Sequence, residues 1–219
     1  MSDLYQDGKT IVASPLKWQK KDRIVALSFL GATTLVFATD ERSQDFFARN
    51  RSDFSNRTAD FFRPLGDKLS FWALGGFYVS GLVLKDQKAK DTAYLGLKSI
   101  FLSQTITRGL KFGFGRARPF VDKGAHYFKP FDFSPTDYSL SLPSGHATTA
   151  FALASVIGHQ YPRWYVKYPV YLLAVGVAWS RCNDNVHFLS DVIVGGGIGF
   201  FVGQKITLLH QKKKASQNP

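Results

Sequence analysis

Six apolar blocks, separated by polar and charged segments, dominate the chain. The blocks are residues 24–39, 69–84, 93–110, 146–157, 168–179 and 188–209. The first two contain no charged residue, and in the third the apolar residues recur at the spacing of a helix rather than with the alternation of a strand. The pattern therefore predicts an all-α fold in which six helices form one bundle.

The first two blocks have 16 residues each, just under the ~17–25 residues that span a bilayer. If every block crosses a membrane, one side receives Lys17, Lys20, Lys21, Arg23, Lys85, Lys88, Lys90, Arg163, Lys167, Lys212, Lys213 and Lys214. The other side receives residues 40–68 and 115–142, where acidic and basic residues are mixed. By the positive-inside rule, we expect six transmembrane helices in an inner or plasma membrane, with both termini cytoplasmic. A soluble six-helix bundle with solvated basic ends is the alternative.

Charge and composition narrow the classes of partner. Lys and Arg number 28 against 16 Asp and Glu, which gives a formal net charge of +12 and favours nucleic acid, a membrane surface or a phosphorylated substrate. The aromatic residues lie mostly inside the apolar blocks instead of alternating with cations, so we expect no nucleic-acid partner. A single cysteine, Cys182, excludes an intramolecular disulfide framework and a cysteine-based zinc site. We interpret Cys182 as structural or incidental.

We expect one domain, residues 24–210, between an N-terminal cytoplasmic segment (1–23) and a polar C-terminal tail (211–219). No apolar stretch precedes residue 24, so no cleavable secretory signal is expected there. The segment 116–142, rich in Pro and aromatic residues, is expected to be an ordered loop that could roof a site. Glycines recur every four residues near the end of the chain and predict a face where a neighbouring helix packs closely. They are Gly195, Gly199 and Gly203.

Three polar clusters are candidates for chemistry, and the first is a group of cations. Lys111 and Arg118, with Arg116 between them, precede Pro119, which would end the third helix. A multivalent anion such as phosphate would relieve their mutual repulsion, because Arg offers a planar fork of donors and Lys a point charge. Taken alone, a solvated or headgroup-contacting helix end is the favoured interpretation.

The second cluster is the sequence Pro143, Ser144, Gly145, His146 at the start of the fourth helix. The N–H groups of a first helical turn bind anions, and the Ser hydroxyl adds a donor. His146 would stand beside a phosphate held there. A plain N-cap followed by a packing histidine is an equally good interpretation of these residues by themselves.

The third cluster contains Ser180, Arg181, His187 and Asp191. Positions 187 and 191 are four apart, so the two side chains share one helix face, and Asp191 can accept a hydrogen bond from one ring nitrogen of His187. The other nitrogen would then be free to act as a nucleophile. In isolation, a helix-capping His–Asp pair is equally plausible.

Together the clusters resemble the signature of the type 2 phosphatidic acid phosphatase (PAP2) superfamily, in its membrane lipid phosphatase branch. The matching residues are Lys, six residues, Arg and Pro at 111–119; Pro, Ser, Gly and His at 143–146; and Ser, Arg, five residues, His, three residues and Asp at 180–191. Agreement of three separate motifs is far more specific than one short motif. The resemblance implies a PAP2/haloperoxidase-like helical bundle.

The resemblance also implies a metal-independent phosphatase that hydrolyses a lipid phosphomonoester or diphosphate through a phosphohistidine. His187 would attack phosphorus, Asp191 would orient it, and His146 would protonate the leaving oxygen and later activate water. The nonbridging phosphate oxygens would be held by Lys111, Arg118, Ser144, Gly145 and Arg181, with no metal and no cofactor. If the predicted crossings are right, the site faces the periplasm or exterior, and the substrate is a lipid such as phosphatidate, phosphatidylglycerol phosphate, undecaprenyl diphosphate or lipid A phosphate.

One segment departs from the family pattern: residues 182–186 form a polar run where many relatives place Tyr and Gly. Within it, Asp184 would either alter phosphate affinity or leaving-group preference, or be a surface loop acid, which is the favoured interpretation. The alternatives for function are a soluble or periplasmic non-specific acid phosphatase of the same superfamily and a membrane protein that binds anionic lipid without catalysis. A vanadate-dependent haloperoxidase is the least supported.

Overall fold

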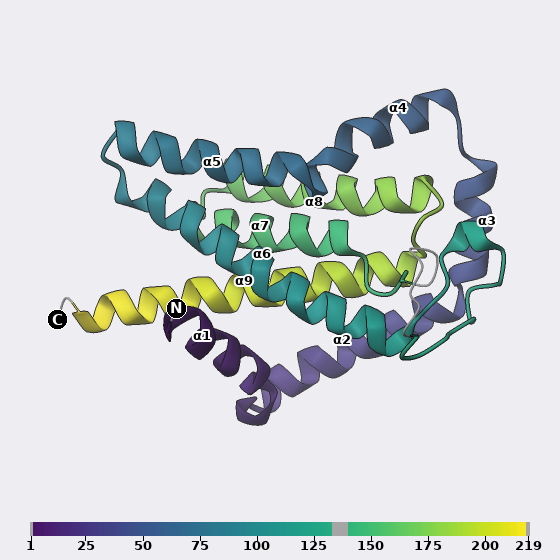
Figure 1. The fold of residues 1–219 in the computed structure, drawn as a ribbon, viewed down its shortest axis with the longest axis horizontal. Helices are drawn as coiled ribbons and strands as arrows, with labels where there is room; N and C mark the ends of the chain where they lie inside the picture. Colours follow the sequence, from purple (N-terminus) through teal and green to yellow (C-terminus); the bar gives the residue numbers. More distant parts are fainter. Residues whose placement is uncertain (1, 133–139, 218–219) are drawn as a thin grey trace.

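The computed structural model describes residues 2–132 and 140–217, and in these ranges the fold is built from helices (Figure 1). The α-helices are α1 (Ser2–Val12), α2 (Lys20–Ala38), α3 (Asp40–Arg49), α4 (Asp53–Phe62), α5 (Lys68–Val83), α6 (Gln87–Phe114), α7 (Gly145–Gln160), α8 (Trp164–Asn183) and α9 (Leu189–Gln217). Short 3-10 helices follow α1, α4 and α6 at Ser14–Lys17, Arg63–Gly66 and Pro119–Val121. The predicted all-α class is confirmed.

The six apolar blocks correspond to α2 and α5–α9. The structure extends most of them because polar residues cap and lengthen the helices. Asp86 caps α6 by accepting hydrogen bonds from the N–H groups of Lys88 and Ala89. At the other end, Gly115 adopts φ 59°, a left-handed conformation that favours glycine and ends the helix before Arg116.

Three helices were not predicted, because they lie in segments too polar to count as apolar blocks. α1 lies in the segment expected to be a simple cytoplasmic extension, and its Asp7 forms a buried ion pair with Lys98 of α6. α3 and α4 occupy the segment between the first two blocks. α9 continues to Gln217, so most of the expected polar tail is helical. Pro135 of the expected roofing loop lies outside the described residues.

Helix α7 forms the centre of the bundle, with most of its residues buried and many of them Ala, Ser or Thr. The small side chains let α9 approach closely. A Cβ atom added to Gly199 would lie 2.2 Å from the carbonyl oxygen of Thr148, and one added to Gly195 would lie 2.4 Å from that of Ser144. The predicted glycine face is therefore confirmed as the contact between α9 and α7.

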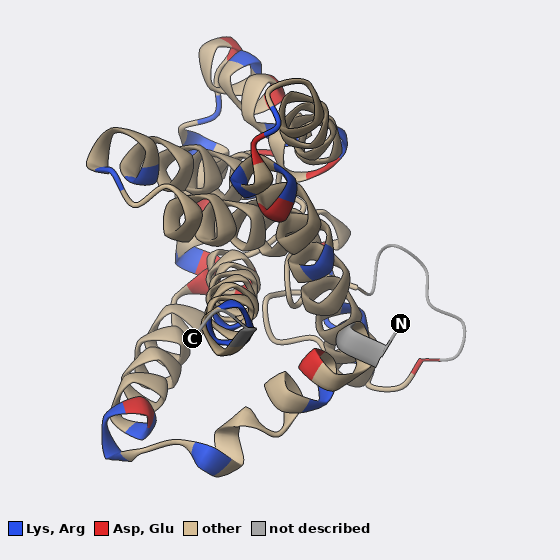
Figure 2. Ribbon diagram, turned by 90° about the vertical axis from the view of Figure 1, so that its left-hand side faces the viewer, with Lys and Arg blue, Asp and Glu red and all other residues tan. Residues whose placement is uncertain are grey.

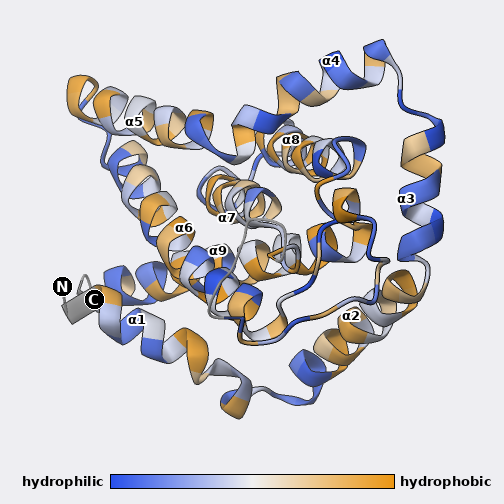
Figure 3. Cartoon of the chain, turned by 45° about the vertical axis from the view of Figure 1, so that its right-hand side comes forward, coloured by the Kyte–Doolittle hydropathy of each residue, from blue (hydrophilic) through white to orange (hydrophobic). Residues whose placement is uncertain are grey.

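The outer surfaces of α2, α5 and α8 are apolar. No residue of α2 is buried, and Trp72 of α5 and Leu172 of α8 are 76% and 70% exposed. Figure 3 shows hydrophobic residues along α2 and α5, and Figure 2 shows long uncharged stretches of helix, with Lys and Arg gathered mainly at helix ends and turns. Apolar surface of this extent marks contact with lipid or with another protein.

Length and hydropathy do not confirm six membrane spans. Among the described helices, α9 over Leu189–Ser216 passes as a span by itself, and α2 with α3 gives a second candidate if the pair, bent by 60°, is taken as one span. α5 and α7 have only 16 residues each, fewer than the ~17–25 that cross a bilayer directly. The first turn of α2 carries charged residues, which shortens the apolar part of this helix.

Candidate active site

The three polar clusters meet at one end of the bundle, where α6 ends, α7 begins and the chain turns from α8 into α9 (Figure 1). Backbone hydrogen bonds join them. The N–H of Ser144 donates to the carbonyl oxygen of Asp191 at 2.9 Å, and the N–H of Ser141 donates to that of Arg116 at 2.9 Å. Segments far apart in the sequence are thus fixed to one another directly at the site.

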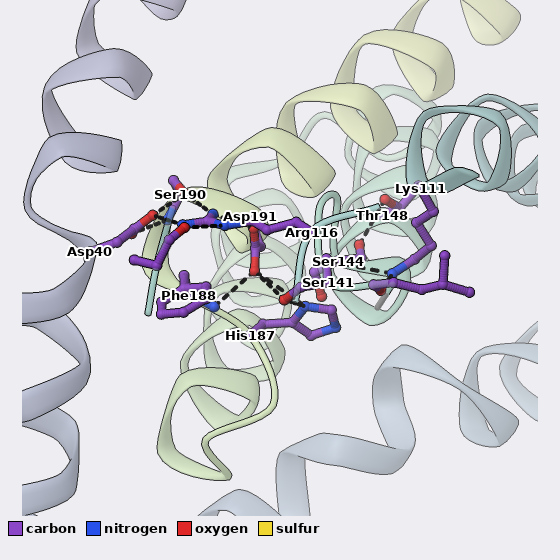
Figure 4. A network of polar contacts seen from close by, with 12 residues as sticks. Asp40, Lys111, Arg116, Ser141, Ser144, Thr148, His187, Phe188, Ser190 and Asp191 are labelled. Carbon is purple, nitrogen blue, oxygen red and sulfur yellow. Dashed lines mark hydrogen bonds and ion pairs between the residues drawn. The ribbon is translucent and has the colours of Figure 1, made fainter. Parts of the chain in front are cut away.

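His187 and Asp191 face each other at the centre of this end (Figure 4). Nδ1 of His187 lies 3.6 Å from Oδ2 of Asp191 and 3.4 Å from the hydroxyl of Ser141. That hydroxyl donates to the same carboxylate oxygen at 2.6 Å, as does the N–H of Phe188 at 2.9 Å. Nδ1 is therefore turned toward the acid, which leaves Nε2 to face away from it. The capping interpretation also holds in part, since Asp191 does cap the first turn of α9.

His187 lies in the turn between α8 and α9 and is buried. Burial lowers its pKa to about 3, an effect that the nearby carboxylate of Asp191 opposes and the charges of Lys111 and Arg118 reinforce. At neutral pH the imidazole is therefore uncharged. An uncharged ring whose Nδ1 faces a carboxylate has its lone pair on Nε2, as a nucleophile requires.

Arg116 lies behind this pair and holds its carboxylate. Its Nη1 donates to Oδ1 of Asp191 at 2.7 Å and its Nη2 donates to Oδ2 of Asp40 at 2.7 Å. All three side chains have no exposed surface. The guanidinium carbon also lies 4.2 Å from the ring centroid of Phe188 and 4.7 Å from that of Phe37. Two carboxylates and two aromatic faces thus compensate the buried cation.

Asp40 is the first residue of α3 and completes the network. Its Oδ1 accepts the N–H of Ser190 at 3.0 Å, and its Oδ2 accepts the hydroxyl of Ser190, next to Asp191 in sequence. Sequence reasoning missed Asp40, Ser141 and the role of Arg116. Arg116 was visible only as a cation between Lys111 and Arg118, and no pattern indicated its partners.

Lys111 and Arg118 lie on the other side of His187. The ammonium of Lys111 donates to the carbonyl oxygens of Leu140 and Ser141, the latter at 3.3 Å, so it fixes the segment that carries the Ser141 hydroxyl. The charge of Arg118 acts on both His187 and His146, so its guanidinium lies near enough to influence both histidines.

The first turn of α7 offers donors to an anion. Ser144 occupies the N-cap position but makes no side-chain capping hydrogen bond, so it does not act as the plain N-cap that was the alternative interpretation. Its buried hydroxyl has no hydrogen-bond partner within residues 2–132 and 140–217. The first N–H groups of a helix also lack intrahelical acceptors. Unpaired donors of this kind are the groups that bind anions at helix N-termini.

Arg181 lies in the last turn of α8, at the same end of the bundle. Its Nη1 donates to Oδ2 of Asp184 at 2.9 Å, and Arg63 donates to the same oxygen from Nε at 2.9 Å. The carboxylate of Asp184 is only 11% exposed, so its interpretation as a solvated loop acid was wrong. Nε of Arg181 is buried and has no hydrogen-bond partner in the described part of the chain. Arg63, which sequence reasoning did not select, shares the acid with it.

The remaining sequence expectations concern Cys182 and metals. Cys182 is buried and packs in an apolar cluster with Ala147 and Val192, as a structural cysteine does. Within the described ranges, no three His, Cys, Asp or Glu side chains are grouped so that they could hold a metal ion.

Known proteins resemble this chain in sequence and in fold. The model of the PAP2 superfamily matches residues 93–215. The lipid A 1-phosphatase of Porphyromonas gingivalis is 27% identical over 183 residues, which cover 82% of this chain and 36% of that protein. The chain thus spans about a third of the length of this curated relative.

Two solved structures share the fold. The crystal structure of Aquifex aeolicus LpxE has a TM-score of 0.59 at 24% identity and covers 76% of this chain and 92% of its own. The second is the crystal structure of a transmembrane PAP2 type phosphatidylglycerolphosphate phosphatase from Bacillus subtilis. It has a TM-score of 0.58 at 21% identity and covers 87% of this chain and 96% of its own.

Proposed function

Because this chain belongs to the PAP2 superfamily, we propose that it is a metal-independent phosphatase acting on a lipid phosphate through a phosphohistidine. The observation that carries the proposal is the buried, uncharged His187, with Nδ1 turned toward Asp191 and Nε2 facing away from it. Around it lie a helix N-terminus and the cations of three segments. Such a site can hold a phosphate dianion and attack its phosphorus.

The reaction has two steps. In the first, Nε2 of His187 forms a bond to phosphorus while the bond to the leaving oxygen breaks, and His146 gives that oxygen a proton. In the second, His146 takes a proton from water, the water oxygen bonds to phosphorus, and the bond to Nε2 breaks. Asp191 stabilises the positive charge that develops on the imidazole.

The nonbridging oxygens of the phosphate carry the charge that must be stabilised in both steps. Arg118 and Arg181 would hold them together with Lys111, the hydroxyl of Ser144 and the backbone N–H of Gly145. The buried Ser144 hydroxyl and Arg181 Nε support this assignment, because each lacks a hydrogen-bond partner among the described residues. A bound phosphate would satisfy both donors.

We propose a lipid phosphomonoester as the substrate class. The relatives are a lipid A 1-phosphatase and a phosphatidylglycerolphosphate phosphatase, so lipid A 1-phosphate and phosphatidylglycerol phosphate are the first substrates to test. Phosphatidate is a further candidate of this class, and undecaprenyl diphosphate represents the alternative class of lipid diphosphates.

We also propose that residues 24–210 form a membrane-embedded unit in which α2 and α5–α9 cross the bilayer, with both termini cytoplasmic. The exposed apolar surfaces of α2, α5 and α8 support contact with lipid, and the lysines at 212–214, near the C-terminal end of α9, support a cytoplasmic end. In this orientation the site faces the periplasm or exterior.

The test is phosphate release by the detergent-purified protein, with EDTA present. The panel contains lipid A 1-phosphate, phosphatidylglycerol phosphate, phosphatidate, undecaprenyl diphosphate and an aryl phosphate. We expect EDTA-resistant release from a lipid phosphate that is lost in His187→Ala. Equal release by this variant would exclude the mechanism, and preference for the aryl phosphate would favour a non-specific acid phosphatase. No release from any substrate would favour a lipid-binding protein without catalysis.

A further inference from the structure

An apolar groove of about 130 Å³ lies between α5, α7 and α8. Its walls include Leu69 and Ala73 of α5, Ala150 and Ala154 of α7, and Ala174 and Val177 of α8. Ser70 is the one lining residue with a polar side chain, and its hydroxyl donates to the carbonyl oxygen of Leu65 at 2.6 Å. The groove therefore offers hydrocarbon contact and no unsatisfied polar group.

The groove begins next to the candidate active site. Ala150 lies one helical turn after His146 on α7, and Val177 lies one turn before Arg181 on α8. Gly66 marks the junction, because a Cβ atom there would lie 2.6 Å from the Val177 side chain and 2.9 Å from the carbonyl oxygen of His146. From this point the lining residues of α7 continue to Ile157, about 10 Å at 1.5 Å per residue.

The chemistry determines which side of the site the lipid occupies. In an in-line displacement the leaving oxygen lies opposite the attacking atom. With Nε2 of His187 attacking and His146 protonating the leaving oxygen, that oxygen lies on the His146 side. The leaving oxygen carries the lipid, so the hydrocarbon begins where the groove begins.

A second apolar groove, of about 150 Å³, lies between α2 and α9 and is lined by Thr34, Ser190 and Val194, among others. It borders Ser190, next to the acid that orients His187, and so lies on the attacking side of the phosphate. It is similar in size to the first groove, although Thr33, Thr34 and Ser190 make its lining more polar, and it lies on the wrong side for a leaving group. It therefore provides a control of similar volume.

We propose that the groove between α5, α7 and α8 binds the part of the substrate's hydrocarbon chain nearest to the phosphate. This inference rests on the proposed function and adds the place where the lipid binds, which predicts a preference for long-chain over short-chain phosphate esters. The small alanine side chains on all three walls leave room for the hydrocarbon in the groove. The rest of the hydrocarbon chain would extend into the surrounding lipid.

The test introduces a larger side chain at the exposed edge of each groove, where it would occupy the space proposed for the hydrocarbon. Ala73 and Thr34 are both exposed, so Ala73→Phe and Thr34→Phe add the same ring without enlarging a buried side chain. For each variant, kcat and KM are measured with dipalmitoyl phosphatidate, a short-chain phosphatidate and an aryl phosphate. Thermal unfolding in detergent serves as the check on folding.

We expect Ala73→Phe to lower kcat/KM for dipalmitoyl phosphatidate roughly tenfold, the loss of about two buried methylene contacts, chiefly through KM. Its turnover of the aryl phosphate should stay within about twofold of wild type, and Thr34→Phe should leave all three substrates unchanged. An equal loss for long-chain and aryl substrates, or a chain-selective loss in Thr34→Phe instead, would overturn the groove assignment alone. A wild-type protein that hydrolyses neither these substrates nor lipid A 1-phosphate and phosphatidylglycerol phosphate would overturn the proposed function as well.

Discussion

The guanidinium of Arg116 donates to the carboxylate of Asp191 over 2.7 Å, and neither side chain has any exposed surface. The same guanidinium binds Asp40, so a cation between two acids fixes the carboxylate that faces His187. Arg116 acts on the site through Asp191 and is a positioning residue. In the sequence it stands between Lys111 and Arg118, but those two cations are expected to contact phosphate, whereas Arg116 contacts carboxylates.

Replacement of Arg116 by Lys keeps the charge but loses the two-pronged geometry that joins Asp40 to Asp191. We expect kcat to fall by about 10–100-fold, as when other outer hydrogen bonds that orient a functional side chain are lost, with little change in KM. Steady-state kinetics on a lipid phosphate measure this split. An increase in KM with kcat unchanged would instead place Arg116 in phosphate binding.

The hydroxyl of Ser141 bridges Asp191 and Nδ1 of His187. Ser141→Ala removes one hydrogen bond, worth about 1 kcal/mol of folding stability, while Arg116 and the Phe188 N–H still hold Asp191. We expect kcat to fall roughly fivefold, because about 1 kcal/mol of stabilisation is lost from the transition state as well, while the protein stays folded. Unchanged kcat in this variant would mean that Ser141 does not help to orient the histidine.

The lowered pKa of His187 can be measured directly. Because burial holds it near 3, the folded protein keeps this ring uncharged while the unfolded chain takes up a proton near pH 6.5. This contribution to stability is therefore complete above about pH 6.5 and decreases as the pH falls toward 3. In protein with isotopically labelled histidines, the resonance absent from His187→Ala should keep its uncharged position down to about pH 4. A titration midpoint near 6.5 would contradict the buried, uncharged nucleophile.

Asp184 neutralises Arg181 and Arg63 at the edge of the site. Asp184→Asn keeps the shape but removes the negative charge, so both cations should attract phosphate more strongly. We expect inorganic phosphate to inhibit this variant about fivefold more tightly, the equivalent of ~1 kcal/mol for a partly exposed ion pair. Weaker inhibition would show that the acid serves mainly to aim Arg181.

The close contact between α9 and α7 makes a stability prediction. A Cβ atom on Gly199 would lie 2.2 Å from the carbonyl oxygen of Thr148, whereas one on Gly75 of α5 would meet nothing within 4 Å. Gly199→Ala should therefore lower the stability by ~1–3 kcal/mol, and Gly75→Ala should leave it equal or slightly higher. Thermal unfolding of both variants in detergent compares them, and equal effects would contradict the packing.

The sequence predicted what depends on local pattern. Runs of apolar residues located α2 and α5–α9, and the four-residue glycine spacing located the face between α9 and α7. The spacing of His187 and Asp191 predicted that they would meet. α3 and α4 were not predicted, because their many polar residues hide the helical spacing of the few apolar ones.

What the sequence could not predict depends on contacts between distant segments. Asp40 precedes Arg116 by 76 positions, and the two meet only because α3 packs near the start of α9. Asp184 looked like a loop acid, since its burial depends on Arg63, which lies 121 positions away. The hydrophobic pattern also could not establish the number of membrane spans, because α5 and α7 are shorter than a helix that crosses a bilayer directly.

The most direct test of the central claim is the capture of the phosphohistidine. His146→Ala should still form the intermediate from an aryl phosphate, whose leaving group needs little help from an acid, but should hydrolyse it slowly. After rapid quenching at alkaline pH, mass spectrometry of this variant should find one phosphoryl group on His187, and none in His146→Ala combined with His187→Ala. Turnover of the aryl phosphate by the wild-type protein, with no phosphoryl group on His187 in His146→Ala at any time, would contradict the account.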